Sequence, residues 1–192
     1  MESAQILYVI GGVVLLFVVA IVLSYNRFVN QRNLIHNSWS NIETELTRRY
    51  DLIPNLVETV KGYAAHERAV LEEVTKARAS AQAEHGSPEQ QARAEGPLIG
   101  ALRHLFAVVE NYPELKASSH FLSLQDELTN TEDRIQAARR FFNANVRDYN
   151  TRVQSFPSNV IAGIFNFELT EYFQIEPALR AETEKPPSTY FA

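Results

Sequence analysis

The feature that most constrains this chain is an uncharged apolar stretch near its N-terminus, which runs from Ile6 to Leu23. A helix rises about 1.5 Å per residue, so this stretch would cover roughly 27 Å, close to the thickness of the hydrocarbon core of a bilayer. In lipid the backbone N–H and C=O groups of a single segment can all be paired internally only if it is a helix. The sequence therefore predicts one transmembrane helix, with Tyr8 and Tyr25 at the two membrane interfaces.

A cleaved signal peptide is the competing interpretation of this segment. Signal peptides have a basic N-terminal region, a hydrophobic run of about 7–15 residues and a small-x-small cleavage site. Residues 1–5 contain no Lys or Arg, the apolar run is longer, and residues 23–26 do not form such a site, so a retained anchor is favoured. Arg27 and Arg32 follow the span and no basic residue precedes it, which predicts a single-pass protein with its N-terminus outside and the rest of the chain in the cytoplasm.

The segment after the anchor has helical spacing. Apolar side chains recur every three or four residues between residues 28 and 53, which predicts that the anchor continues as one long helix. Pro54 lacks an N–H and disfavours helical geometry in the residue before it, so we expect it to kink or restart this helix. A second helix is then predicted up to the breaker at residues 86–88, and a third from Pro88 to Asn111.

The longest regular pattern in the chain predicts a fourth helix. Its positions alternate in steps of three and four residues, and most are apolar or aromatic: Phe121, Leu124, Leu128, Thr131, Ile135, Ala138, Phe142, Asn145, Tyr149, Arg152 and Phe156. A seam of this length needs equally long partner helices. The sequence therefore predicts an all-α protein in which the transmembrane helix continues into an elongated antiparallel four-helix bundle. Residues 1–25 would form the anchor, 26–156 the bundle, and 157–192 a short aromatic helical segment with a Pro-rich tail that is extended from Pro177.

Composition and motifs argue against several classes of function. The net charge is −5 and no stretch is densely basic, so we expect no nucleic-acid partner. The chain has no cysteine, which excludes disulfides and thiolate nucleophiles. His66-Glu67 lacks the second histidine of a zinc-protease helix, and no Glu-x-x-His pair of the di-iron type occurs. We therefore expect no catalytic residues, no metal site and no cofactor.

Two polar features have both a functional and a structural interpretation. Residues 48–51 place two arginines, a tyrosine and an aspartate side by side, as in an acid–base or anion site, but a structural ion-pair cluster is favoured because such networks are commoner. In the first helix asparagines recur every three or four residues, at Asn26, Asn30, Asn33, Asn37 and Asn41. Asparagine is a poor helix former. The asparagines either bond between helices or lie on a solvated face, and Asn33, Asn37 and Asn41 are the predicted self-association residues.

Two long segments resemble the LemA family: RRYDLIPNLVETVKGYAAHE, residues 48–67, and residues 106–167, which begin FAVVENYPELKASSHFLSLQDELTNTEDRIQAARRFFNANVRDYN. Together with the anchor, the resemblance covers nearly the whole chain. It implies a bacterial membrane protein whose soluble part is an antiparallel helical bundle, and it implies no reaction. Magnetosome membrane proteins are similar to this family, and the family often occurs together with membrane metalloproteases.

These observations lead to two hypotheses about function. The first is a non-enzymatic scaffold in the bacterial cell membrane that self-associates through its long helices, with the lipid bilayer and further copies of itself as partners. The second is an adaptor that presents clients to a membrane metalloprotease or an envelope stress-response complex, and therefore has a membrane-protein partner. An enzyme ranks third because the search for catalytic motifs returns none.

Overall fold

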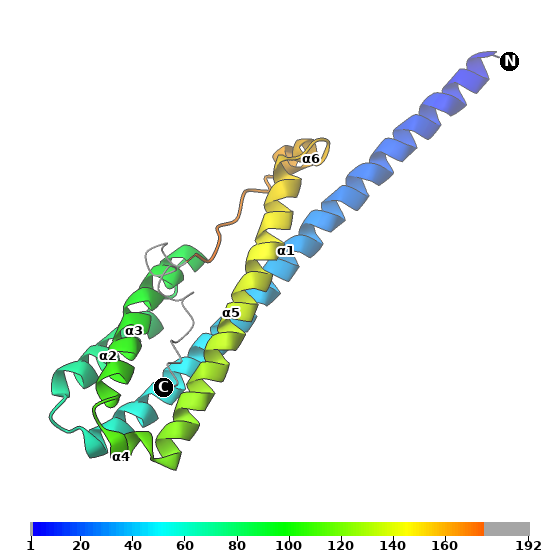
Figure 1. Cartoon of the computed structure of the whole chain (residues 1–192). Helices are drawn as coiled ribbons and strands as arrows, with labels where there is room; N and C mark the ends of the chain where they lie inside the picture. Colours follow the sequence, from blue (N-terminus) through cyan, green and yellow to red (C-terminus); the bar gives the residue numbers. More distant parts are fainter. Residues whose placement is uncertain (1, 175–192) are drawn as a thin grey trace, which may run out of the picture. The chain divides into compact units, whose positions relative to one another are not determined.

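The computed structural model describes residues 2–174 of the 192-residue chain, so the Pro-rich tail predicted from Pro177 lies outside the described part. All regular structure among the described residues is helical, which confirms the all-α prediction, whereas the four-helix-bundle packing stays a prediction. The helices, labelled in Figure 1, are α1 (Glu2–Tyr63), α2 (Arg68–Gln82), α3 (Pro88–Val109), α4 (Pro113–Lys116), α5 (Ser119–Gln154) and α6 (Ser158–Ile164).

The chain divides into two compact units, which are described separately. Among the described residues, unit 1 consists of residues 2–39 and 141–170, so it holds the first part of α1, the end of α5 and α6. Unit 2 consists of residues 40–140 and 171–174, and it holds the rest of α1 and α5 together with α2, α3 and α4.

The N-terminal part of α1 has the properties of a membrane-spanning helix. By length and composition it can cross a bilayer, and none of its most apolar window is buried within the protein. Side chains from Gln5 to Ala20 are exposed, whereas Ile21 and Ser24, near the end of the apolar stretch, are half-buried. The folded part of unit 1 therefore reaches the last turns of the apolar segment.

Pro54 lies inside the first helix, so the predicted restart at this residue is wrong, whereas the alternative of a kink stays a prediction. α1 continues through Pro54 to Tyr63, and the chain turns at residues 64–67 instead. A proline leaves the carbonyl four residues earlier without its helical donor, here the carbonyl of Tyr50. The Nε of Arg78 in α2 donates to that carbonyl at 2.6 Å. A tertiary hydrogen bond thus compensates for the helical bond that proline removes.

Unit 2 is built on one buried apolar face from each of its helices. In Figure 1, α2 and α3 run side by side, joined by a short turn at the predicted breaker. Ser87 and Gln90 form a capping box that begins α3, with the Ser87 N–H donating to the Gln90 side chain at 2.7 Å. The buried apolar residues include Ile42, Leu46, Ile53, Leu56, Val60, Val70, Leu71, Val74, Leu98, Leu105, Val109, Leu115, Phe121, Leu124, Leu128 and Ile135.

The seam predicted for the fourth helix agrees with burial in α5 at seven of its eleven positions, while Ala138, Asn145 and Arg152 are half-buried. Phe121, Leu124, Leu128, Thr131, Ile135, Phe142 and Tyr149 are buried. The prediction is wrong for Phe156, whose side chain is 82% exposed, because α5 ends at Gln154 and the chain leaves the helical path before this residue. The pattern also passes over Val146, which is fully buried next to the predicted position Asn145.

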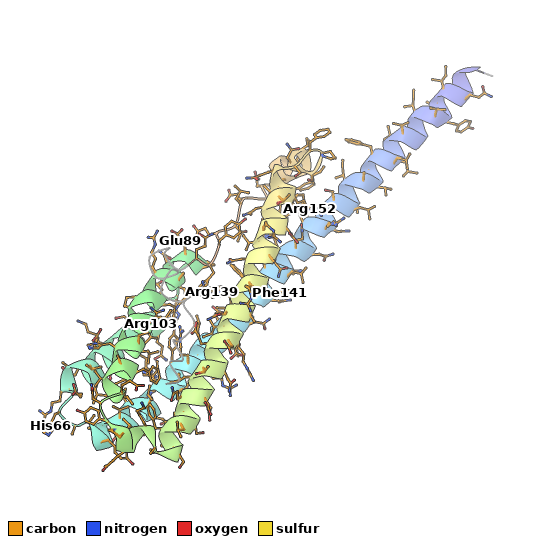
Figure 2. All side chains as sticks on the ribbon, viewed as in Figure 1. His66, Glu89, Arg103, Arg139, Phe141 and Arg152 are labelled. Atoms are coloured by element: carbon orange, nitrogen blue, oxygen red, sulfur yellow. The ribbon has the colours of Figure 1, made fainter. Side chains whose placement is uncertain are left out.

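Unit 1 is held together by aromatic contacts. The ring of Phe28 in α1 stacks on Phe167, with centroids 4.6 Å apart, and meets Tyr149 of α5 edge-on at 6.1 Å. The guanidinium of Arg152, labelled in Figure 2, lies 6.0 Å from the Phe28 ring centroid. Beyond α6, the side chain of Asn150 both donates to and accepts from the backbone of Thr170, each at 2.9 Å. These bonds hold the segment after α6 against α5.

Candidate functional site

A buried polar cluster in unit 2 draws on α1, α2, α3 and α5. Of residues 48–51, singled out in the sequence, the cluster contains Arg49 and Tyr50, which are buried. Arg48 and Asp51 are exposed to solvent. Helix periodicity explains the difference, since residues 49 and 50 continue the buried face of α1 that includes Leu46.

The carboxylate of Glu95, on α3, lies at the centre of this cluster. Its side chain is 1% exposed and it accepts hydrogen bonds from the guanidinium of Arg49, from the hydroxyl of Tyr50 and from the amide of Gln91. Arg49 is 3% exposed and also pairs with Glu132 of α5, whose Oε2 lies 2.8 Å from Nη1. The buried positive charge is therefore shared by two carboxylates.

Tyr50 connects this ion pair to α2. Its hydroxyl donates to Glu95 and accepts from the Gln91 amide at 3.1 Å, and the same amide lies 3.1 Å from the backbone carbonyl of Ala81 at the end of α2. Burial raises the pKa of Tyr50 above the usual value for tyrosine, and the negative charge of Glu95 raises it further. Tyr50 is consequently a neutral hydrogen-bond donor at any physiological pH.

The geometry favours the structural interpretation of this cluster. A general acid or base must be able to reach a substrate atom within hydrogen-bond distance. Both oxygens of Glu95 are instead engaged by partners from its own chain, and its side chain has almost no contact with solvent. Buried pairs of this kind can specify which helix faces meet. The cluster thus links three helices to α1 in one register.

Sequence reasoning found Arg49 and Tyr50 but missed Gln91 and Glu95. Their spacing could have revealed them. Gln91 and Glu95 are one helical turn apart, on the same face of α3 as Leu98 and Leu105. An ionisable residue in an otherwise apolar stripe is almost never fully buried without a partner. A buried arginine elsewhere was therefore implied.

The predicted self-association residues lie on the side of α1 opposite its buried face. Asn33, Asn37 and Asn41 are exposed, as are Asn26 and Asn30. At 3.6 residues per turn they point away from the face that buries residues 28, 35 and 42. Leu34 falls among them and is half-exposed. We call the surface formed by these five asparagines and Leu34 the asparagine face.

The histidines are dispersed over the described part of the chain. His66 lies exposed in the turn between α1 and α2, where Figure 2 labels it. The Nδ1 of His104 lies 3.0 Å from Glu73 at an exposed contact between α3 and α2. Among residues 2–174, no group of three or more His, Asp and Glu side chains is placed so that it could hold a metal ion.

Sequence comparison identifies the family. Magnetosome protein MamQ of Magnetospirillum gryphiswaldense is 29% identical, over 84% of this chain and 69% of the relative. Magnetosome protein MamQ 2 of Paramagnetospirillum magneticum is 30% identical over 86% and 70%, and protein LemA of Metamycoplasma hominis 27% identical over 79% and 70%. None of these names denotes a reaction. Residues 38–191 match the LemA family, and because that match spans most of the chain, this protein belongs to the LemA family.

Proposed function

We propose that this protein is a non-enzymatic, membrane-anchored scaffold that self-associates and organises membrane or membrane-protein assemblies. The observation that carries the proposal is the asparagine face, which is exposed on the same unbroken helix that begins with the apolar anchor.

The chemistry of the asparagine face suits contact between identical copies. A carboxamide offers donors and acceptors at once, so the same surface on two copies can pair with itself without like-charge repulsion. Asparagine also disfavours helix formation relative to Lys, Glu or Gln, the residues that usually cover a solvated helix. The exposed Leu34 adds apolar area that would be buried in such a contact.

Membrane attachment strengthens weak contacts of this kind. Copies anchored in one bilayer share an orientation and have a raised local concentration, which acts as linkage does in multivalent binding. Two of the relatives described above are named as magnetosome proteins. These names and the apolar anchor together support a role in organising membranes.

The test is the oligomeric mass of the full-length protein in several mild detergents and in nanodiscs, measured by sedimentation. We expect a homo-oligomer whose mass falls in the triple variant Asn33→Ala, Asn37→Ala, Asn41→Ala, while helicity measured by circular dichroism is unchanged or slightly raised. A matched control changes three exposed polar residues outside the asparagine face, His36→Ala, Thr47→Ala and Asn130→Ala, and should keep the wild-type mass.

A protein that is monomeric in every detergent and in nanodiscs would contradict the scaffold proposal. The adaptor hypothesis would then take its place, and cross-linking in native membranes followed by mass spectrometry would identify the membrane-protein partner. Equal loss of mass in the triple variant and in the control would show that a different surface makes the contact.

A further inference from the structure

The chain exposes a second apolar surface in unit 1, at α6 and its flanks. The side chain of Phe156 is 82% exposed and that of Ile164 is 63% exposed, and Val160, Phe165 and Leu169 are also exposed. We call these five residues the α6 patch. Val160 and Ile164 lie one turn apart on the outer face of α6, while Ile161 and Ala162 are buried on its inner face.

The composition of this segment sets it apart from the rest of the soluble part. No residue from Val153 to Phe167 carries a formal charge, in a chain of which 21% of the residues are charged. Large exposed apolar patches on soluble proteins mark contacts with other proteins or with membranes. Exposed apolar surface is therefore concentrated in α6 and the residues on either side of it.

The α6 patch adjoins the end of the apolar part of α1. The ring centroid of Phe165 lies 4.8 Å from that of Tyr25, and that of Phe167 lies 5.7 Å from it. Tyr25 lies two residues after the end of the apolar stretch and precedes Arg27, the first charged residue after it. The patch therefore continues the apolar surface of the anchor, at the level where the anchor must leave the hydrocarbon.

The orientation of the patch is held by the fold of unit 1. Phe167 stacks on Phe28 and the guanidinium of Arg32 lies 5.9 Å from its ring centroid, while Asn150 holds the backbone of Thr170 on the other side. The side chain of Ser158 at the start of α6 donates to the carbonyl of Arg152 at 2.7 Å. The apolar side chains of α6 consequently cannot turn inward without breaking these contacts.

We propose that the α6 patch enters the lipid interface beside the anchor and is a second membrane-contacting element of the protein. An aromatic side chain at the end of a membrane span lies at the headgroup level, so a ring in contact with Tyr25 lies at the same depth. Aromatic and aliphatic side chains gain by entering that region, and residues 153–167, which hold four of the five patch residues, carry no charge that opposes it. The fifth patch residue, Leu169, follows the exposed Glu168. Arg32 lies beside Phe167, next to the patch, and a basic side chain at this depth is attracted to lipid phosphates.

This inference rests on the anchor and is independent of self-association. Its occupant is lipid rather than a second copy, because the patch is continuous with the apolar surface of the anchor through the contact between Phe165 and Tyr25. Seating the patch in the interface would fix the rotation of α1 about its own axis. A bare single span lacks any such constraint.

The test uses full-length protein in vesicles of phosphatidylcholine and phosphatidylglycerol. The parent chain has no cysteine, so an environment-sensitive dye can be attached at one introduced cysteine: Val160→Cys or Ile164→Cys in the patch, and Leu15→Cys in the span. Leu122→Cys is the matched control, because it is an exposed apolar residue of α5 in unit 2. Lipids that carry a quencher near the headgroup or deep in the acyl chain report depth.

We expect the headgroup-proximal quencher to reduce emission at residues 160 and 164, the deep quencher to reduce it at residue 15, and neither to affect residue 122. In a Leu169→Cys reporter, the added changes Val160→Asn and Ile164→Asn should abolish quenching while the added change Leu122→Asn should not. Unquenched dye at 160 and 164, with residue 15 quenched, would overturn the proposal. An emission shift there that depends on protein density instead of lipid quencher would assign the patch to a second copy, and an unquenched residue 15 would remove the anchor on which the proposal rests.

Discussion

The Nε of Arg78 donates a hydrogen bond to the backbone carbonyl of Tyr50, the carbonyl to which Pro54 can offer no N–H. The two residues belong to different helices, and the 2.6 Å contact replaces a bond that α1 cannot make for itself. A buried or half-buried carbonyl without a donor costs free energy, so this contact allows the helix to pass its proline.

Removal of the Arg78 donor should therefore destabilise unit 2. We expect Arg78→Met to lower the free energy of unfolding by about 1–3 kcal/mol, the cost of leaving a carbonyl unpaired. In a Pro54→Ala background, residue 54 regains its N–H and the same change should cost clearly less. Denaturant unfolding of the four proteins in detergent, followed by circular dichroism, measures the difference. Equal costs in the two backgrounds would show that Arg78 acts through another contact.

The buried ion pair predicts an asymmetric response to substitution. Glu95→Leu leaves the charge of Arg49 buried with only the half-exposed Glu132, and should cost about 3–5 kcal/mol. Adding Arg49→Met to Glu95→Leu should restore part of this stability, because an uncharged pair has no desolvation cost. Glu132→Ala should cost about 1 kcal/mol or less, since its side chain stays in partial contact with water. A double variant less stable than Glu95→Leu alone would contradict this account.

The raised pKa of Tyr50 predicts a loss of stability in alkaline solution. An unfolded tyrosine ionises at about pH 10, whereas burial and Glu95 hold the proton on Tyr50 in the folded state. The unfolded state then binds fewer protons above that pH, so the stabilising contribution is complete below about pH 10 and falls as the pH rises beyond it. Tyr50→Phe should be less stable at neutral pH by about 1 kcal/mol, and its stability should fall less steeply above pH 10. Parallel slopes for both proteins would disprove the assignment.

Charges introduced along α5 should separate its buried and exposed sides. Ile135→Asp and Phe142→Asp each place a carboxylate in a closed site, Phe142 being packed 5.5 Å from Trp39, and should cost several kcal/mol. Ala137→Asp, on the exposed side of the same helix, should cost under about 1 kcal/mol. Thermal unfolding in detergent measures all three, and a large effect at Ala137 would mean that this side of α5 is covered in the intact protein.

The anchor and its orientation make a prediction in cells. Full-length protein should remain in the membrane pellet through carbonate washing, because its apolar segment is long enough to span the bilayer. A cysteine introduced at the exposed Asn130 should resist an impermeant maleimide in whole cells and react after lysis, as expected for a cytoplasmic domain. Labelling of intact cells would reverse the orientation, and release by carbonate would argue for the signal-peptide interpretation.

Helical spacing alone predicts most of the buried positions of the helices. Ile35, Ile42 and Leu46 are buried as their three-and-four spacing indicates, and the breaker at residues 86–88 separates α2 from α3. These features are local, since they depend on the period of the helix and on residues that end it. The asparagine spacing likewise places the five asparagines on a single face, but it leaves open whether that face is exposed.

The features that the sequence does not predict depend mainly on contacts between helices. The passage of α1 through Pro54 depends on Arg78, which lies on another helix, and no local rule anticipates it. The partners of Arg49, Glu95 and Glu132, are still more remote in sequence. The turn at residues 64–67 contains neither Gly nor Pro, so it carries no strong turn signal.

The carbonyl of Tyr50, which lacks a donor within its own helix, also sets how α1 and α2 align. Side-chain stripes on helices repeat every turn, so sliding α2 by one turn along α1 would still bring apolar residues together. Such a slide would move Arg78 from Tyr50 to carbonyls that already accept an N–H from their own helix. Pro54 is the one interruption in that pattern within the part of α1 contained in unit 2. A residue usually regarded as a helix breaker thus encodes the register of the neighbouring helix.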